Sequence, residues 1–255
     1  MIHPQALVDP KADLADDVEV GAFTIIEAGV RIDAGTWIGP HVVLKGPMHI
    51  GRHNRIYQFC SLGEAPQDLK YQGEQTRLVI GDHNTFREYV TVNRGTVGGH
   101  GETIIGSHNL VMAYVHIAHD CIIGNHVIFS NAASLAGHVT IDDHAILGGF
   151  TLVHQFSHIG AHAFTGMGTA LNRDLPPYTL ASGNYARAVG INKEGLRRRG
   201  FPPEVIRALS TAFRLLIKGH DRERALRELR PLEERYEEVR HFVDFVRNSR
   251  RGVVR

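Results

Sequence analysis

Residues 117–159 read IAHDCIIGNHVIFSNAASLAGHVTIDDHAILGGFTLVHQFSHI and repeat with a period of six residues. Each unit begins with an aliphatic residue or phenylalanine: Ile117, Ile123, Phe129, Leu135, Ile141, Leu147, Val153 and Ile159. An α-helix, with about 3.6 residues per turn, does not produce this spacing, and neither does a single strand, whose period is about two. The pattern predicts short strands joined by corners, with three units closing a triangular coil of 18 residues whose aliphatic side chains stack inside.

The same spacing extends to both sides, from Ile2 to Leu62, from Ile80 to Val92 and from 105 to 171. Of 26 such positions 25 are aliphatic or phenylalanine, so we predict a parallel β-helix over residues 1–177. Two interruptions stand out. Residues 64–77 carry acidic residues where aliphatic ones are expected, which predicts a projecting loop, and the Gly-rich VGGHGET (97–103) holds one surplus residue. Loops that leave a rigid scaffold are frequent functional sites.

The repeat ends at Pro176-Pro177, and we expect residues 178–192 to form a linker. The following stretch PPEVIRALSTAFRLLIKG (202–219) places apolar residues at helical spacing, and residues 222–247 continue as one or two amphipathic helices. The sequence therefore predicts a helical C-terminal domain over 193–255 that caps the coil, as the ends of solenoids require.

Charge divides the chain into two unlike parts. Residues 1–186 carry 10 basic and 17 acidic residues, a balance of −7, whereas residues 187–255 carry 18 and 10, a balance of +8.

The two cysteines, Cys60 and Cys121, both occupy an inward position of the repeat, so we interpret them as buried thiols of a reducing compartment. The start MIHPQALVDP lacks the pattern of a secretory signal, and no apolar stretch is long enough to span a membrane. These observations favour a cytoplasmic protein.

Eight of the 17 histidines share one position of the repeat, three residues after an aliphatic residue: His41, His53, His83, His108, His126, His138, His144 and His162. This regularity indicates a recurrent, mostly solvated turn residue, so a chemical role for any of them needs separate support.

A contiguous polar patch follows from the 18-residue lap. Adding 18 to His119 gives Gly137, and adding 18 again gives Gln155, so these three should stack on successive coils. By the same arithmetic His138 stacks on Asp120, and His154 lies two coils from Ala118. A histidine beside a carboxylate suits general base catalysis, with Asp120 orienting the ring.

The N–H of Gly137 could stabilise an oxyanion, so the patch fits direct attack of an alcohol or amine on a thioester. No Ser or Cys nucleophile accompanies the histidine, since Cys121 points inward. The residues alone leave open that Asp120 is a simple turn carboxylate.

The sequence also resembles the UDP-N-acetylglucosamine O-acyltransferases, over nearly the whole chain. The matching stretches are IYQFCSLGEAPQDLKYQGEQTRLVIGD (56–82), NRGT (93–96), HIAHDCIIGN (116–125), LAGHVTIDD (135–143), LVHQFSHIGAHAF (152–164) and NKEGLRRRGF (192–201). The resemblance implies a left-handed coil, a homotrimer with sites in the clefts between coils, and no cofactor or metal. It implies transfer of an (R)-3-hydroxyacyl group from acyl carrier protein to the 3-hydroxyl of UDP-N-acetylglucosamine, the first step of lipid A biosynthesis.

The resemblance also implies roles for individual residues. His119 falls on the general base and Gly137 on the oxyanion donor, while Asp68 and Lys70 match loop residues that contact the sugar nucleotide. His116, His138, His154 and Gln155 match family residues that line the cleft around the general base. Positions that bind the nucleotide and the carrier match Asn192, Glu194, Arg198 and Arg199. An acidic carrier protein suits the +8 balance of the C-terminal part, whereas no motif indicates nucleic acid.

The sequence departs from the family at two positions. Met167 stands where some members have Gly at the far end of the acyl groove, which predicts a shorter, medium-chain hydroxyacyl donor such as hydroxydecanoyl. The plainer alternative is that Met167 only packs at a corner. Asn93, before RGT, stands where relatives often carry His, and we assign it no role.

Three other functions compete. The N-acyltransferase of the same pathway carries an additional N-terminal uridine-binding domain, for which repeats that start at Ile2 leave no room. A zinc-dependent hydratase on the same fold would use His116 and His119 as ligands, but the HIAHD context fits the transferase better. A purely structural trimeric scaffold would leave the QDLKY loop and the histidine patch unexplained.

Overall fold

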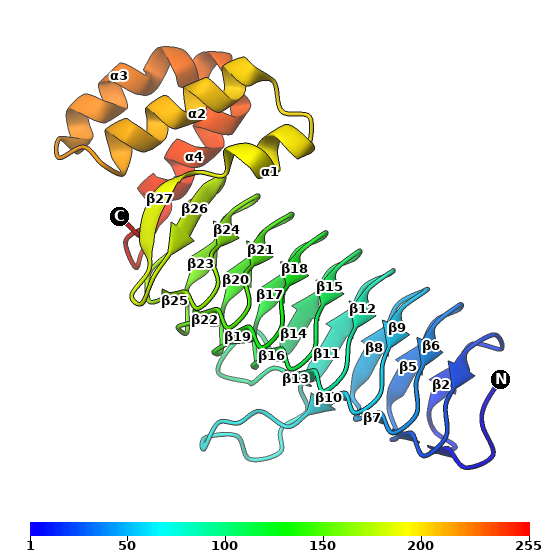
Figure 1. Cartoon of the computed structure of the whole chain (residues 1–255). Helices are drawn as coiled ribbons and strands as arrows, with labels where there is room; N and C mark the ends of the chain where they lie inside the picture. The colour runs from blue at the N-terminus through cyan, green and yellow to red at the C-terminus, as the bar shows by residue number, and fades with distance from the viewer.

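A computed structural model describes residues 1–255 as a long coil that ends in a group of helices (Figure 1). Three sheets, parallel except at the C-terminal end of one, form the three faces of a left-handed β-helix. The nine-stranded sheet contains β1 (Leu7–Val8), β4 (Ile25–Ile26), β7 (Val43–Leu44), β10 (Ser61–Glu64), β13 (Thr91–Asn93), β16 (His116–Ile117), β19 (Ser134–Leu135), β22 (Leu152–Val153) and β25 (Ala170–Leu171).

Within each lap the chain then contributes one strand to the eight-stranded sheet and one to the ten-stranded sheet. The eight-stranded sheet contains β2 (Asp13–Leu14), β5 (Val30–Ile32), β8 (Met48–Ile50), β11 (Arg77–Ile80), β14 (Glu102–Ile105), β17 (Ile122–Ile123), β20 (Thr140–Ile141) and β23 (His158–Ile159). The ten-stranded sheet contains β3 (Glu19–Val20), β6 (Trp37–Ile38), β9 (Arg55–Ile56), β12 (Thr85–Phe86), β15 (Leu110–Val111), β18 (Ile128–Phe129), β21 (Ile146–Leu147), β24 (Phe164–Thr165), β26 (Thr179–Ser182) and β27 (Arg187–Ile191).

The register confirms the predicted lap of 18 residues. His116 pairs with Ser134, and Ser134 pairs with Leu152, so equivalent residues of successive coils lie side by side. The aliphatic residues that begin each unit fill the interior, where burying one such side chain contributes about 1.5–3 kcal/mol. Thr165, the single polar residue at such a position, is fully buried and its hydroxyl bonds that of Thr151 at 2.8 Å. Cys60 and Cys121 are buried free thiols, as expected.

The three corners of the coil are turns in which one residue adopts a positive φ. We call the corner between the nine- and eight-stranded sheets the first corner; it holds Asp120, His138 and Phe156. The second corner, between the eight- and ten-stranded sheets, holds His53, His83, His108, His126, His144 and His162. The third corner, between the ten- and nine-stranded sheets, holds Phe23, His41, Phe59, Tyr89, Tyr114, Ala132, Phe150 and Gly168.

The eight repeat histidines are turn residues, as predicted, because all have φ between 55° and 64°. Five of them are exposed, while His138, His144 and His162 are partly buried. They do not share one edge of the molecule, however. Six line the second corner, His41 lies at the third, and only His138 lies at the first.

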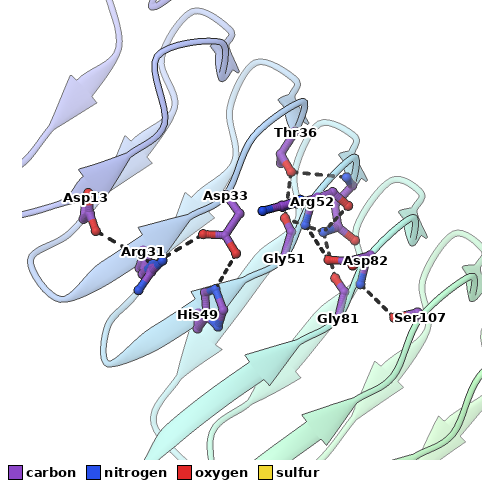
Figure 2. A network of polar contacts seen from close by, with 11 residues as sticks. Asp13, Arg31, Asp33, Thr36, His49, Gly51, Arg52, Gly81, Asp82 and Ser107 are labelled. Carbon is purple, nitrogen blue, oxygen red and sulfur yellow. Dashed lines mark hydrogen bonds and ion pairs between the residues drawn. The ribbon is translucent and has the colours of Figure 1, made fainter.

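Polar side chains join neighbouring coils near the N-terminal end (Figure 2). Arg31 lies between Asp13 and Asp33, at 3.8 and 3.3 Å, and His49 bonds Asp33 at 2.8 Å. The hydrogen bond from His49 holds the pKa of the Asp33 carboxyl below its usual value. The register places Arg31 opposite both Asp13 and His49, and Asp33 follows Arg31 on the same coil. The Asp13–Arg31 and Asp33–His49 pairs therefore tie the outer face of successive coils together.

Residues 65–76, between β10 and β11, leave the coil as a long loop that projects from its side (Figure 1). The coil ends in a hairpin rather than in the linker that we expected over residues 178–192. β26 and β27 pair antiparallel there and extend the ten-stranded sheet. The segment lacks the six-residue repeat because an antiparallel hairpin does not wind around the axis.

Four helices pack on the end of the coil: α1 (Lys193–Arg198), α2 (Pro203–Leu216), α3 (Arg222–Arg235) and α4 (Glu237–Asn248). Their buried residues, such as Leu209 and Phe242, belong to the same hydrophobic cluster as the interior of the coil. The last residues return to the coil, where Asp174 pairs with Val253 and accepts a hydrogen bond from the Ser249 hydroxyl at 2.6 Å. No helix is long and apolar enough to cross a membrane.

Candidate active site at the first corner

His119 and Asp120 form a hydrogen-bonded pair at the first corner. His119 Nδ1 lies 2.8 Å from Asp120 Oδ2, and the two side chains are 14% and 0% exposed. Because an ionised carboxylate can only accept a hydrogen bond, Nδ1 must carry the proton in the neutral imidazole. The Nε2 atom is then left with a lone pair, which is the arrangement that a general base requires.

The carboxylate of Asp120 is enclosed by the Gly-rich loop that follows β13. It accepts the Thr96 hydroxyl at 2.6 Å, the Thr96 N–H at 3.0 Å and the His100 N–H at 3.0 Å. Burial raises the pKa of Asp120, but the hydrogen bonds from Thr96, His119 and His100 outweigh it and leave the pKa below its usual value. Asp120 is therefore an ionised, fully buried partner of His119 as well as a turn residue.

Gly137 lies directly beside the His119 ring on the next coil, as the 18-residue arithmetic predicts. A Cβ atom at residue 137 would lie 2.6 Å from His119 Cε1 and 2.7 Å from Nε2, so only glycine leaves room for the imidazole. The Gly137 N–H donates no hydrogen bond within the chain, and neither do those of His119 and Gln155 at the equivalent turn positions. This donor is free to meet an oxyanion.

Two further histidines surround the pair. His116 Nδ1 bonds the Thr91 hydroxyl at 2.8 Å, and burial lowers its pKa, with a smaller contribution from His119. His138 packs edge-on against His119, with ring centroids 5.1 Å apart. Burial lowers the pKa of His138 although the Asp120 carboxylate acts in the opposite direction. Both rings are therefore disposed to be neutral near pH 7.

Residues of the projecting loop approach this corner. The loop joins β10 of the nine-stranded sheet to β11 of the eight-stranded sheet, so it leaves the coil at the first corner. Asp68 is partly buried there, and its charge acts to raise the pKa of His138 against the larger effect of burial. The Asp68 carboxylate accepts the backbone N–H of Lys70 at 3.0 Å, and the Lys70 side chain is exposed.

His154 and Gln155 lie on the following coil and are exposed. Arg251, from the C-terminal tail, lies 3.2 Å from His154 Nδ1 and also bonds the carbonyl of Asn172 at 3.3 Å. Sequence reasoning missed Arg251, since its position follows from the return of the tail to the coil.

The other candidate residues lie away from the first corner. Met167 is 81% exposed beside Gly168 at the third corner. Asn192 caps α1 and donates to the His162 carbonyl at 3.1 Å, and Arg199 bonds the His144 side chain, which places both at the second corner. Arg198 and Glu194 are exposed on α1 and form an ion pair at 3.0 Å.

Three groups of the first corner are close enough to bind a metal ion. The ligating atoms of His119, Asp120 and His138 lie within 4.8 Å of one another. The Asp120 oxygens, however, already accept hydrogen bonds from two backbone N–H groups, the Thr96 hydroxyl and His119. A carboxylate used in this way fits the orientation of a base better than the binding of a cation.

Thr96 was also missed from the sequence, although a signal for it existed. The surplus residue in 97–103 indicates that the chain leaves the coil just after Thr96. Loops that leave a rigid scaffold are frequent functional sites. What could not be foreseen is that the loop folds back onto Asp120.

Together these groups can remove a proton from a hydroxyl or amine and stabilise the oxyanion formed by its attack on an acyl carbon. Comparison with known proteins assigns the family. The profile of UDP-N-acetylglucosamine O-acyltransferase, domain 2, matches residues 174–254, and that of the bacterial transferase hexapeptide matches residues 102–137. The acyl-[acyl-carrier-protein]–UDP-N-acetylglucosamine O-acyltransferase of Stutzerimonas stutzeri is 55% identical over 256 residues, covering 100% of this chain and 99% of its own. The chain belongs to this acyltransferase family.

Solved structures of the UDP-N-acetylglucosamine O-acyltransferase family agree along the whole chain. The enzyme from Moraxella catarrhalis superposes with a TM-score of 0.96 at 45% identity, covering 100% of this chain and 99% of its own. The Acinetobacter baumannii structure gives a TM-score of 0.96 at 44% identity, with the same coverage. The hairpin and the helices belong to the part that the domain 2 profile matches, so the helical cap is a feature of the family.

Proposed function

We propose that this chain transfers an (R)-3-hydroxyacyl group from the thioester of acyl carrier protein to the 3-hydroxyl of UDP-N-acetylglucosamine, the first step of lipid A biosynthesis. The observation that carries the proposal is the His119–Asp120 pair beside a glycine whose N–H is free. Family membership supports the choice of substrates, since relatives are named for them. Two buried free thiols suit a reducing compartment, and we place the reaction in the cytoplasm.

The proposed reaction needs no enzyme-bound intermediate. His119 Nε2 removes the proton of the sugar hydroxyl as its oxygen attacks the thioester carbon, and Asp120 stabilises the imidazolium. The carbonyl oxygen becomes an oxyanion that accepts the Gly137 N–H. The intermediate collapses with cleavage of the carbon–sulfur bond, and the imidazolium returns the proton to the departing thiolate. General base catalysis contributes about 10²–10⁴ in rate, and one oxyanion donor about 10²–10³.

Residues around the pair suit a sugar nucleotide. We assign Asp68 and Lys70 of the projecting loop to the sugar and phosphates, since an exposed ammonium can neutralise a phosphate. The neighbouring coils supply polar contacts through His116, His138, His154 and Gln155. Neutral imidazoles can donate or accept hydrogen bonds with hydroxyl groups, which suits rings whose pKa burial has lowered.

A complete site needs more than one copy of the chain. His119 lies at the first corner, Arg199 at the second and Met167 at the third. One ligand on the outside of a triangular coil can reach a single face and its two corners, but not all three corners. We therefore propose a homotrimer in which the first corner of one subunit faces the ten-stranded sheet of another.

In this trimer the nucleotide and the carrier contact Asn192, Glu194, Arg198 and Arg199. A basic cavity of about 450 Å³ between α1 and α2 adds Lys193, Arg197 and Arg207, and its charge suits an acidic carrier protein.

Met167 sets the length of the acyl donor in this proposal. Its side chain is 81% exposed at the third corner, so it packs against little within its own chain and is available to close a groove. We expect the wild type to prefer a medium-chain donor such as hydroxydecanoyl, and Met167→Gly to shift the preference to longer chains. Competition between hydroxyacyl carrier thioesters of different length measures this, and an unchanged preference contradicts it.

The decisive assay supplies the purified protein with a hydroxyacyl carrier thioester and UDP-N-acetylglucosamine. We expect the wild type to form the 3-O-acyl product and His119→Ala to lose at least about 10³ in kcat, the scale of base and orientation effects combined. Full activity of His119→Ala would overturn the assignment of the base. Formation of no product by the wild type would overturn the proposed function itself.

A further inference from the structure

Residues 93–100 (NRGTVGGH) lie between two parts of the proposed site and contact both. The segment begins at the end of β13 and includes most of the Gly-rich loop. Its first half touches the start and the middle of the projecting loop, and its second half encloses Asp120. Only Gly95 separates these halves, and a Cβ there would lie 2.2 Å from the Glu102 nitrogen, so the chain is tightly packed at this point.

The first half holds the projecting loop through Asn93 and Arg94. The Arg94 guanidinium donates to the Gly63 carbonyl at 2.8 Å and to the Tyr71 hydroxyl at 3.1 Å. The side-chain amide of Asn93 donates to the Ala65 carbonyl at 2.9 Å. Arg94 therefore joins the base of the loop to Tyr71, the residue after Lys70. Its guanidinium also lies over the Tyr71 ring, 5.6 Å from the centroid.

The second half holds the carboxylate of Asp120. The buried Thr96 donates both its hydroxyl and its N–H, and His100 donates its N–H. Gly99 lies so close that a Cβ would be 2.3 Å from Asp120 Cγ, so any side chain there would displace the carboxylate. Three donors around one buried carboxylate fix its orientation, and through it the orientation of the His119 ring.

We propose that residues 93–100 form a single clamp that positions the substrate loop and the catalytic pair together. Arg94 and Thr96 are its two positioning residues, and neither contacts the reacting atoms. The assignment rests on the proposed function, because it takes Asp68 and Lys70 as substrate contacts and His119 as the base. It also gives Asn93 a purpose, as an anchor of the loop.

Thr96→Val removes the hydroxyl but keeps the shape of the side chain, and Thr96→Ser keeps the hydroxyl. We expect Thr96→Val to lower kcat about tenfold, the scale of one hydrogen bond to a charged group, and Thr96→Ser to restore it. Loss of this bond raises the pKa of Asp120 and leaves it a stronger acceptor for His119, so the acid limb of the kcat/KM profile moves to higher pH. A merely structural role would leave the limb in place, and that result overturns the second half of the clamp.

The first half is tested without any substrate. Lys70 is the trypsin site of the projecting loop, and we expect Arg94→Gln to be cut there about five- to tenfold faster than the wild type, as one or two lost hydrogen bonds would allow. Arg87→Gln is the matched control, since Arg87 pairs with Glu88 on the surface and does not touch the loop. We also expect Arg94→Gln to raise KM for the sugar nucleotide.

An unchanged rate of cleavage in Arg94→Gln overturns the first half of the clamp. If the wild type transfers no acyl group, the proposed function fails, but the cleavage assay still decides whether the segment holds the loop.

Discussion

At the scale of single residues, the site depends on the absence of a side chain at residue 137. The His119 ring occupies the space that a Cβ of Gly137 would take, with the nearest ring atom only 2.6 Å from that position. Gly137 has no positive φ, so its backbone accepts alanine and only the ring stands in the way. Glycine is required here by its neighbour and not by its own conformation.

We expect Gly137→Ala to lower kcat about a hundredfold, because the methyl group must displace the imidazole and a misplacement of about 1 Å can cost that much in rate. The thermal midpoint should fall little, since the His119 side chain is partly exposed and can rotate towards solvent. Gly190→Ala is the matched control, because a Cβ there meets nothing within 4 Å. An unaltered kcat in Gly137→Ala would show that the ring is not held beside residue 137 during catalysis.

At the scale of elements, the second corner carries a column of stacked imidazoles. Ring centroids of successive histidines lie 4.8 or 4.9 Å apart, in the order His53, His83, His108, His126, His144 and His162. Tyr178 closes the column, and Phe201 packs edge-on against His162. The stacking follows from the fold, since each histidine occupies the same turn position one lap further on.

Titration of His162 should make the protein acid-sensitive. Burial lowers its pKa to about 4, with further contributions from His144, Arg199 and His241, while Asp143 acts in the opposite direction. The unfolded chain then binds more protons than the folded one between about pH 6.5 and pH 4, so stability is lost as the pH falls through this window. At about 1.4 kcal/mol per pKa unit between 6.5 and about 4, the loss from this group is at most about 3.5 kcal/mol.

We expect His162→Asn to flatten the fall of the thermal midpoint between pH 6.5 and pH 4, since asparagine tolerates the positive φ of 58° but does not titrate. His53→Asn, at the exposed end of the same column, is the control and should keep the slope of the wild type. Equal slopes in His162→Asn and wild type would mean that other groups govern acid unfolding.

The same elements show how far the sequence could be interpreted. A period of six residues requires a coil, and a lap of 18 residues then brings His119 beside Gly137 without any further information. The hairpin of β26 and β27 could not be predicted in this way, because antiparallel pairing depends on contacts with the helices and the tail rather than on a repeat. The contacts of Thr96 and Arg94 were likewise hidden, since they arise where two loops leave the coil and meet.

At the scale of the whole molecule, the placement of candidate residues at three corners predicts that subunits share their sites. His119 of one chain should work with Arg198 and Arg199 of another. A chain that lacks His119 and a chain that lacks both arginines are then each defective when alone, for different reasons. Mixed trimers would contain some sites in which the intact His119 meets the intact arginines.

We expect His119→Ala and the double variant Arg198→Ala/Arg199→Ala each to be nearly inactive, and their co-expressed mixture to regain activity. With equal amounts and random assembly, half of the chains supply each intact part, so about a quarter of the sites are complete. If one chain instead held a whole site, every chain in the mixture would carry a lesion, and activity would stay at the mean of the two parents. A control mixes one part of wild-type chains with three parts of His119→Ala/Arg198→Ala/Arg199→Ala chains. A shared site is complete there only when both contributing chains are wild type, which holds for about one sixteenth of the sites after random assembly. The activity of this mixture relates measured rate to the fraction of complete sites.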